Sequence, residues 1–161
     1  MATKPNTVFL DTLKAAPAPL GIFEVEKGDP DSALLAAWNK RQHILSEIEA
    51  IGRFYDADDN CPEKMVVFDA LESTIPKMPA LTARGLLAKL WVTLAHYGGF
   101  VTDEETRAES DTIRRADFDA VEAFEDRLDF EQGALFRAIR DLRYWLQFEQ
   151  VGYLPQRKLE Q

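Results

Sequence analysis

One stretch of this sequence constrains the fold more than any other, because residues 79–99 contain all the signals of a single helix. Thr82 is placed to accept a hydrogen bond from a free backbone N–H of the first turn, and Leu81 can pack on Leu86 as a hydrophobic staple. From there apolar side chains recur every three or four residues, at Leu86, Leu87, Leu90, Trp91 and Leu94. Two glycines after Tyr97 end the pattern. The stretch therefore predicts an amphipathic helix that contributes to a core.

Two helices are predicted upstream of this one. The first opens at Asp29, with Pro30 in its first turn, and covers about residues 30–56. Its apolar stripe consists of Leu34, Trp38, Leu45, Ile48 and Tyr55, flanked by Leu35, Ile44 and Ile51. The second begins after Asn60, which acts as a cap ahead of Pro62 and Glu63, and runs to about Thr74. Its inner face consists of Met65, Phe68, Leu71 and Ile75.

Downstream, the sequence from Thr102 to Gln150 is compatible with helix throughout. It starts with a capping-box pattern at residues 102–105, and it contains no proline and a single glycine, Gly133. A helical rhythm links Val121, Phe124, Leu128, Leu135, Ile139, Leu142 and Leu146, so one long helix would satisfy it. We favour a break near Asp129, which can cap toward Gln132 and so begin a separate helix.

Together these patterns predict an all-α fold, a bundle of four to five helices with an extended N-terminal arm. Prolines and small residues define the arm over residues 1–28, a single helical domain follows over residues 29–150, and residues 151–161 form a C-terminal tail. No segment of useful length alternates apolar and polar residues as a strand would, although residues 23–26 could pair briefly. The side chains expected in the core are Trp38, Phe68, Leu86, Leu90, Leu94, Val121, Phe124, Leu142 and Leu146.

Charge narrows the range of partners. The formal net charge is −9, which disfavours direct binding of nucleic acid because that affinity depends on cationic side chains. Twelve acidic and four basic residues fall within residues 103–131. A hypothesis is that this segment presents an acidic face made of Asp111, Glu122, Glu125, Asp126 and Asp129. The ordinary alternative is a solvated helix.

Aromatic and arginine residues gather near the end of the last helix. Arg137, Arg140 and Arg143 lead into a cluster made of Tyr144, Trp145, Phe148 and Tyr153, and such mixtures are typical of protein interfaces. This pattern predicts a surface for a protein partner, made of Arg137, Arg140, Tyr144, Trp145 and Phe148, with a homodimer through the C-terminal helix as one form of it. The alternative is that the arginines face the acidic segment within the same molecule.

No residues form a recognisable catalytic, cofactor-binding or metal-binding set. His43, Cys61 and His96 are suitable metal ligands, but they lack the local spacing of a zinc site. Asp56, Asp58 and Asn60 match only the beginning of a calcium loop.

The first turn at Thr82–Gly85 could hold an anion, although capping alone explains its residues. A single cysteine and the absence of a long apolar run predict a cytoplasmic protein that does not associate with membranes.

Segments of the chain resemble a set of uncharacterised small helical proteins of alphaproteobacterial genomes and prophages. The resemblance rests on Pro79-Ala-x-Thr82-x-x-Gly85-Leu86-x-Ala88-Lys89-Leu90, with Glu72-x-x-Ile75 before it and Ala138-Ile-x-Asp-Leu142 after it. It covers about residues 31–146 and implies a shared helical fold, without a catalytic residue to transfer.

The function predicted from these observations is a non-enzymatic protein–protein interaction module, whose protein partner the sequence does not identify. One alternative is an acidic inhibitor that masks the basic, nucleic-acid-binding surface of a partner. The other is an enzyme or metal protein with a site that the sequence does not reveal.

Overall fold

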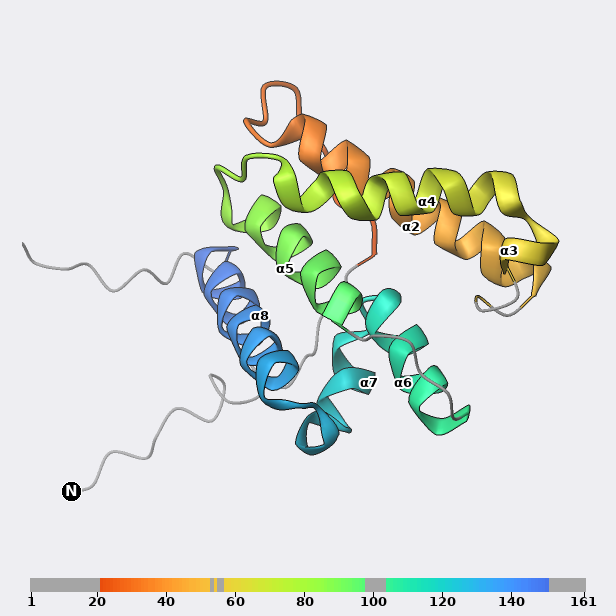
Figure 1. Ribbon diagram of the computed structural model, residues 1–161. Helices are drawn as coiled ribbons and strands as arrows, with labels where there is room; N and C mark the ends of the chain where they lie inside the picture. Colours follow the sequence, from red (N-terminus) through yellow and green to blue (C-terminus); the bar gives the residue numbers. More distant parts are fainter. Residues whose placement is uncertain (1–20, 53, 55–56, 98–103, 151–161) are drawn as a thin grey trace, which may run out of the picture.

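The computed structural model describes residues 21–52, 54, 57–97 and 104–150. Within these ranges the chain forms seven α-helices, two short 3-10 helices and no strand, which confirms the all-α prediction (Figure 1). The α-helices are α2 (Ser32–Ile51), α3 (Ala57–Asn60), α4 (Pro62–Thr74), α5 (Ala83–Tyr97), α6 (Glu104–Arg114), α7 (Phe118–Glu122) and α8 (Phe130–Gln150). The 3-10 helices are η2 (Ile75–Lys77) and η3 (Glu125–Arg127). Residues 1–20 of the predicted arm and the tail 151–161 lie outside the described residues.

The longer helices form two antiparallel pairs, and α5 joins one pair to the other (Figure 1). Helices α2 and α4 run antiparallel to each other, and α5 and α8 form a second antiparallel pair. Helix α5 also contacts α2, η2 and α6, so it lies at the centre of the molecule. The position of α5 therefore constrains the positions of α2, α6 and α8, which all pack against it.

Most of the predicted core is confirmed. The larger apolar cluster consists of Leu34, Trp38, Ile75, Leu87, Ala88, Trp91, Val92, Leu94, Ala95, Ile113, Ala116, Phe118, Val121, Phe124, Phe136 and Ile139. A smaller one between α2, α3 and α4 consists of Ile44, Leu45, Ile48, Ala57, Cys61, Met65 and Phe68. Leu90, Leu142 and Leu146 pack on the larger cluster and are partly buried. Burial of Leu86 was predicted wrongly, because Gly85, Leu87 and Ala88 occupy the inner face of α5 while Leu86 is exposed.

Short-range capping signals located the starts of α4 and α5 well, but the limits of the first helix were predicted wrongly: α2 begins at Ser32 after the N-cap Asp31, and it ends at Ile51 instead of near residue 56. Thr82 caps α5 as predicted, since its Oγ accepts a hydrogen bond of 3.1 Å from the Gly85 N–H. Leu81 and Leu86 are both exposed, so the predicted staple adds nothing to the core. Helix α4 has its predicted limits, but its N-cap is Cys61, because Asn60 is the last residue of α3.

Two interruptions divide the helical stretch after residue 103. The break at Asp129 is confirmed: its carboxylate accepts from the Gln132 N–H at 2.8 Å, and the Gln132 side chain accepts from the Asp129 N–H at 3.3 Å. The predicted capping box at residues 102–105 begins outside the described residues.

A second break, at Ala116, was not predicted. Ala116 has a φ of 56°, and hydrogen bonds from its own N–H to Ile113 and from Asp117 to Thr112 form a Schellman motif. Glycine usually takes this conformation, so an alanine gave no signal of it. Asp117 then caps α7 by accepting from the Ala120 N–H at 3.2 Å. Together with the short helix α3, the second break explains why the described residues form seven α-helices instead of the four or five predicted.

A buried carboxylate holds α5 against α2. Asp31, the N-cap residue of α2, is only 2% exposed and accepts three hydrogen bonds from the start of α5. The backbone N–H groups of Leu81 and Thr82 each donate to it at 2.8 Å, and the Thr82 hydroxyl donates at 2.6 Å. Arg84 adds an ion pair with Asp29 at 2.6 Å. These contacts determine how the two helices meet.

The close approach of Asp31 explains the glycine at position 85. A Cβ atom there would overlap the Asp31 carboxylate and lie 2.9 Å from Leu34 Cδ2. Because Gly85 has no side chain, the carboxylate can reach the first turn of α5.

The described end of the predicted arm lies along α2. Phe23 exchanges two hydrogen bonds of 2.8 Å with the Asn39 side chain, and the Trp38 indole donates to the Gly21 carbonyl at 2.9 Å. Residues 21–28 thus form an irregular segment that covers part of Trp38.

We expect Gly85→Ala to lower the free energy of unfolding by about 1–3 kcal/mol, because the added methyl group forces Asp31 and Leu34 apart. Gly133→Ala is the matched control, since a Cβ there meets only the flexible end of Arg137, at 3.3 Å. That change should leave stability unaltered or raise it by up to about 1 kcal/mol. Urea denaturation of both variants measures the difference. Equal effects of the two substitutions would contradict the role given to Gly85.

Asp31 should also make stability depend on pH. Burial raises the pKa of Asp31, but the hydrogen bonds from Thr82 and Leu81 and the nearby Arg84 outweigh burial and hold the pKa below its ordinary value of 3.8. The ionised group therefore stabilises the fold at higher pH, and this contribution disappears as the pH falls through the folded-state pKa.

We expect the stability of Asp31→Asn to approach that of the wild type as the pH falls from about 5 to about 2. Exposed Asp59→Asn, with the same change in charge, should follow the wild-type curve throughout. Denaturation midpoints measured across this range test the expectation. A stability gap for Asp31→Asn that stays constant with pH would show that its carboxylate is not responsible.

Candidate functional site

The arginines of α8 bind the acidic segment of the same molecule. Glu125 in η3 forms ion pairs with Arg140 at 2.7 Å and with Arg137 at 3.4 Å. Arg143 lies 3.6 Å from Asp119 of α7, with its guanidinium 4.0 Å from the centre of the Phe118 ring. Burial lowers the pKa of Arg143, while the charge of Asp119 raises it. Arg140 and Arg143 therefore face the acidic segment within the same molecule, which was the alternative to a role in binding a partner.

The residues predicted to form an acidic face do not share a helix. Asp111 lies in α6, where Arg114 pairs with it at 3.2 Å, and burial raises the pKa of Asp111. Glu122 ends α7, Glu125 and Asp126 lie in η3, and Asp129 caps α8. The turn at Ala116 separates α6 from the rest, so the predicted band along one helix is not formed.

Other side chains of α8 face away from the molecule. Phe130 is 81% exposed, Trp145 is 47% exposed and Tyr144 is 39% exposed. Ala134, Ala138 and Asp141 are exposed as well, and the spacing of these residues places them on one stripe of the helix. We call this stripe, with Arg137 at its edge, the outer face of α8.

Three of the five predicted interface residues belong to this outer face: Arg137, Tyr144 and Trp145. Arg140 turns inward to Glu125, and the side chain of Phe148 lies outside the described residues. Sequence reasoning missed Phe130, Ala134, Ala138 and Asp141, although their spacing of three and four residues was available as a signal.

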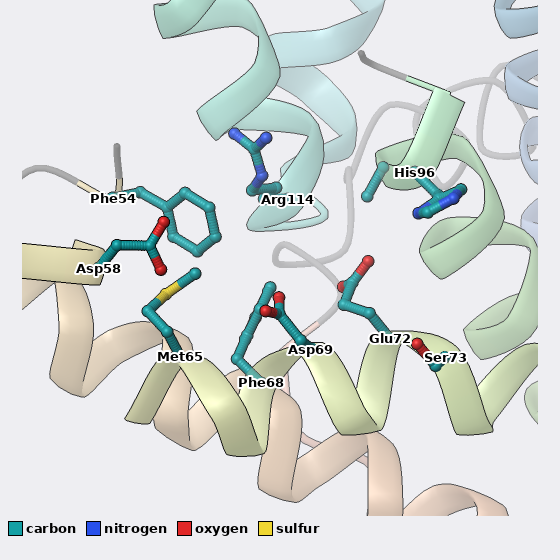
Figure 2. Close-up of a pocket in the computed structure, with 10 residues that line it drawn as sticks. Phe54, Asp58, Met65, Phe68, Asp69, Glu72, Ser73, His96 and Arg114 are labelled. Carbon is teal, nitrogen blue, oxygen red and sulfur yellow. The ribbon is translucent and has the colours of Figure 1, made fainter. Parts of the chain in front are cut away.

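A cavity of about 590 Å³ opens on the other side of the molecule, between α3, α4 and the ends of α5 and α6 (Figure 2). Its lining residues are Phe54, Asp58, Met65, Phe68, Asp69, Glu72, Ser73, Ala95, His96 and Arg114. Burial and the charge of Asp58 raise the pKa of Asp69. Carboxylates outnumber cations in this lining, which favours a positively charged group over an anion.

A buried arginine lies behind the wall of this cavity. Arg41 is 1% exposed, and its Nε is 2.5 Å from the Glu72 carboxylate. Its Nη1 donates to the Arg114 carbonyl at 2.8 Å, and its guanidinium lies 5.0 Å from the centre of the Phe68 ring. Burial lowers the pKa of Arg41, and the Glu72 carboxylate opposes that shift. Arg41 therefore connects α2, α4 and α6.

Arg41 was also missed at the level of sequence. It lies three residues after Trp38 and four before Leu45, and so within the apolar stripe of α2. A charged residue in that position signals a buried ion pair, but the sequence does not show that Glu72 is the partner.

The other residues considered from the sequence lie apart. His43 is exposed on α2 beside Glu47, Cys61 is buried next to α4, and His96 lines the cavity. Nowhere in the described ranges do three His, Cys, Asp or Glu side chains come together as metal ligands. Of the calcium-loop residues, Asp58 and Asn60 belong to α3, and Asp56 lies outside the described residues. At the start of α5, the Asp31 carboxylate occupies the position expected for an anion.

Comparison of the chain with protein-family models, with curated proteins and with solved structures finds no match. None of the helices in the described part of the chain combines the length and the apolar character that a bilayer crossing requires.

The buried ion pair between Arg41 and Glu72 should contribute more to the free energy of unfolding than an exposed ion pair does. We expect Glu72→Ala to lower the free energy of unfolding by about 3 kcal/mol or more, because it leaves a buried guanidinium without its carboxylate. Glu49→Ala removes the partner of Arg115, which is half exposed, and should cost about 1 kcal/mol or less. Chemical denaturation at neutral pH compares the two. Similar losses for both would contradict the special role of Arg41.

Proposed function

We propose that this chain is a non-enzymatic protein–protein interaction module that acts in the cytoplasm. In this proposal it belongs with the bacterial and prophage helical proteins that its sequence resembles, and it docks through the outer face of α8. The observation that carries the proposal is the exposure of three aromatic side chains on one stripe, Phe130, Tyr144 and Trp145.

The composition of this stripe supports a docking role. Tryptophan, tyrosine and arginine are the residues that contribute most often to binding energy at protein interfaces. A solvated helix needs no large aromatic side chains on its outer side, so their exposure at Phe130, Tyr144 and Trp145 favours an interaction surface. Arg137 at the edge of the stripe, with its side chain 49% exposed, adds a polar group for orientation.

The acidic-inhibitor alternative has less support. Asp111 and Glu125 are engaged in ion pairs within the molecule, and the Asp129 carboxylate caps α8. Only Glu122 and Asp126 of the five proposed acidic residues are exposed without an ion pair to another described residue. Two separated carboxylates make a weak surface for a basic partner.

Site-specific photo-crosslinking in cells tests the docking role. A photoreactive amino acid placed at Ala134 or Asp141 should yield adducts with protein, because both positions are exposed beside the aromatic residues. The same probe at Ala36, an exposed position on α2, is the control and should yield few adducts. Adducts at Ala36 as abundant as those on α8 would sink the proposal, and so would their absence from both α8 positions.

A further inference from the structure

The charges on the outer face of α8 are arranged so that they complement a second copy of the same face. Arg137 and Asp141 lie one turn apart, with the basic residue nearer the start of the helix. Two parallel copies would place like charges together. Two antiparallel copies would instead place Arg137 of each beside Asp141 of the other.

Both charged groups are available for such a contact. No hydrogen bond or ion pair holds Asp141 to another described residue, and its side chain is exposed. Arg137 reaches Glu125 only at 3.4 Å, whereas Arg140 pairs with the same carboxylate at 2.7 Å. Arg137 can therefore leave Glu125 without depriving that carboxylate of a cation.

The apolar residues fit the same antiparallel register. When two α8 helices cross near Ala138, Phe130 of one copy comes opposite Trp145 of the second copy, because both lie seven or eight residues from the crossing. Alanines at positions 134 and 138 carry the smallest side chains of the stripe, so the two helices can approach closely at the centre. A twofold axis at the crossing repeats every contact.

We infer that the outer face of α8 docks onto the α8 outer face of a second copy, in an antiparallel pair centred near Ala138. This inference rests on the proposed docking role of α8 and adds the identity and orientation of the partner. The aromatic side chains bury each other at the two ends, and the two Arg137–Asp141 pairs fix the register.

Charge reversal and restoration tests this arrangement. Sedimentation velocity of the full chain, from micromolar to submillimolar concentration, should show a monomer–dimer equilibrium. Arg137→Glu and Asp141→Arg should each weaken the dimer at least about tenfold, because each places like charges together. The double variant should recover affinity to within about threefold of the wild type, since the same pairs form with exchanged signs. Lys40→Glu, an exposed reversal on α2, should leave the dimer unchanged.

Cysteine crosslinking checks the register independently. Ala138→Cys should form an interchain disulfide quickly under mild oxidation, because the two copies of position 138 meet at the crossing. Ala36→Cys, exposed on α2, should not, and the native Cys61 is buried.

Three results would overturn the inference: a monomer at every concentration, a double variant no better than the single ones, or equal crosslinking at 36 and 138. If α8 photo-crosslinks to other proteins while the chain sediments as a monomer, the docking role stands and the self-pairing is wrong.

Discussion

The fold depends on one buried carboxylate at the junction of two helix starts. Asp31 is the N-cap residue of α2 and accepts hydrogen bonds from the backbone N–H groups of Leu81 and Thr82, the two residues immediately before α5. A charged group in such a place is costly unless it is fully hydrogen-bonded, and here three donors compensate it. Because α5 carries the contacts to α2, α6 and α8, the alignment of its first turn determines the position of the whole bundle.

Features encoded within a few residues were predictable from the sequence. The caps at Thr82 and Asp129 and the proline-led start of α4 were all located correctly, because each signal and its partner lie within one helical turn. Burial of the large apolar side chains followed from helical periodicity in the same way. Leu86 was predicted wrongly. Gly85 lies against Asp31 and Leu34 on the inner face of α5, and the neighbouring Leu86 therefore points to solvent.

Features that join distant parts of the chain were not predictable. Asp31 meets a turn fifty residues away, and Arg41 meets Glu72 thirty-one residues away, so neither pairing has a local signal. The turn at Ala116 lacked the glycine that normally marks it. The outer face of α8 was recognised in part, from its aromatic and arginine residues, but separating Arg137 from Arg140 required the position of η3.

Arg41 has a further consequence for how the molecule behaves as one body. Its guanidinium lies between Trp38 of the larger apolar cluster and Phe68 of the smaller one. The two clusters are thus joined through an ionic group as well as through the partly buried Leu71, which packs on both. Apolar contacts tolerate small displacements, whereas a hydrogen-bonded ion pair in low-dielectric surroundings does not. Separation of α2 from α4 would take the buried Arg41 guanidinium away from Glu72, so we expect the two clusters to unfold together rather than one after the other.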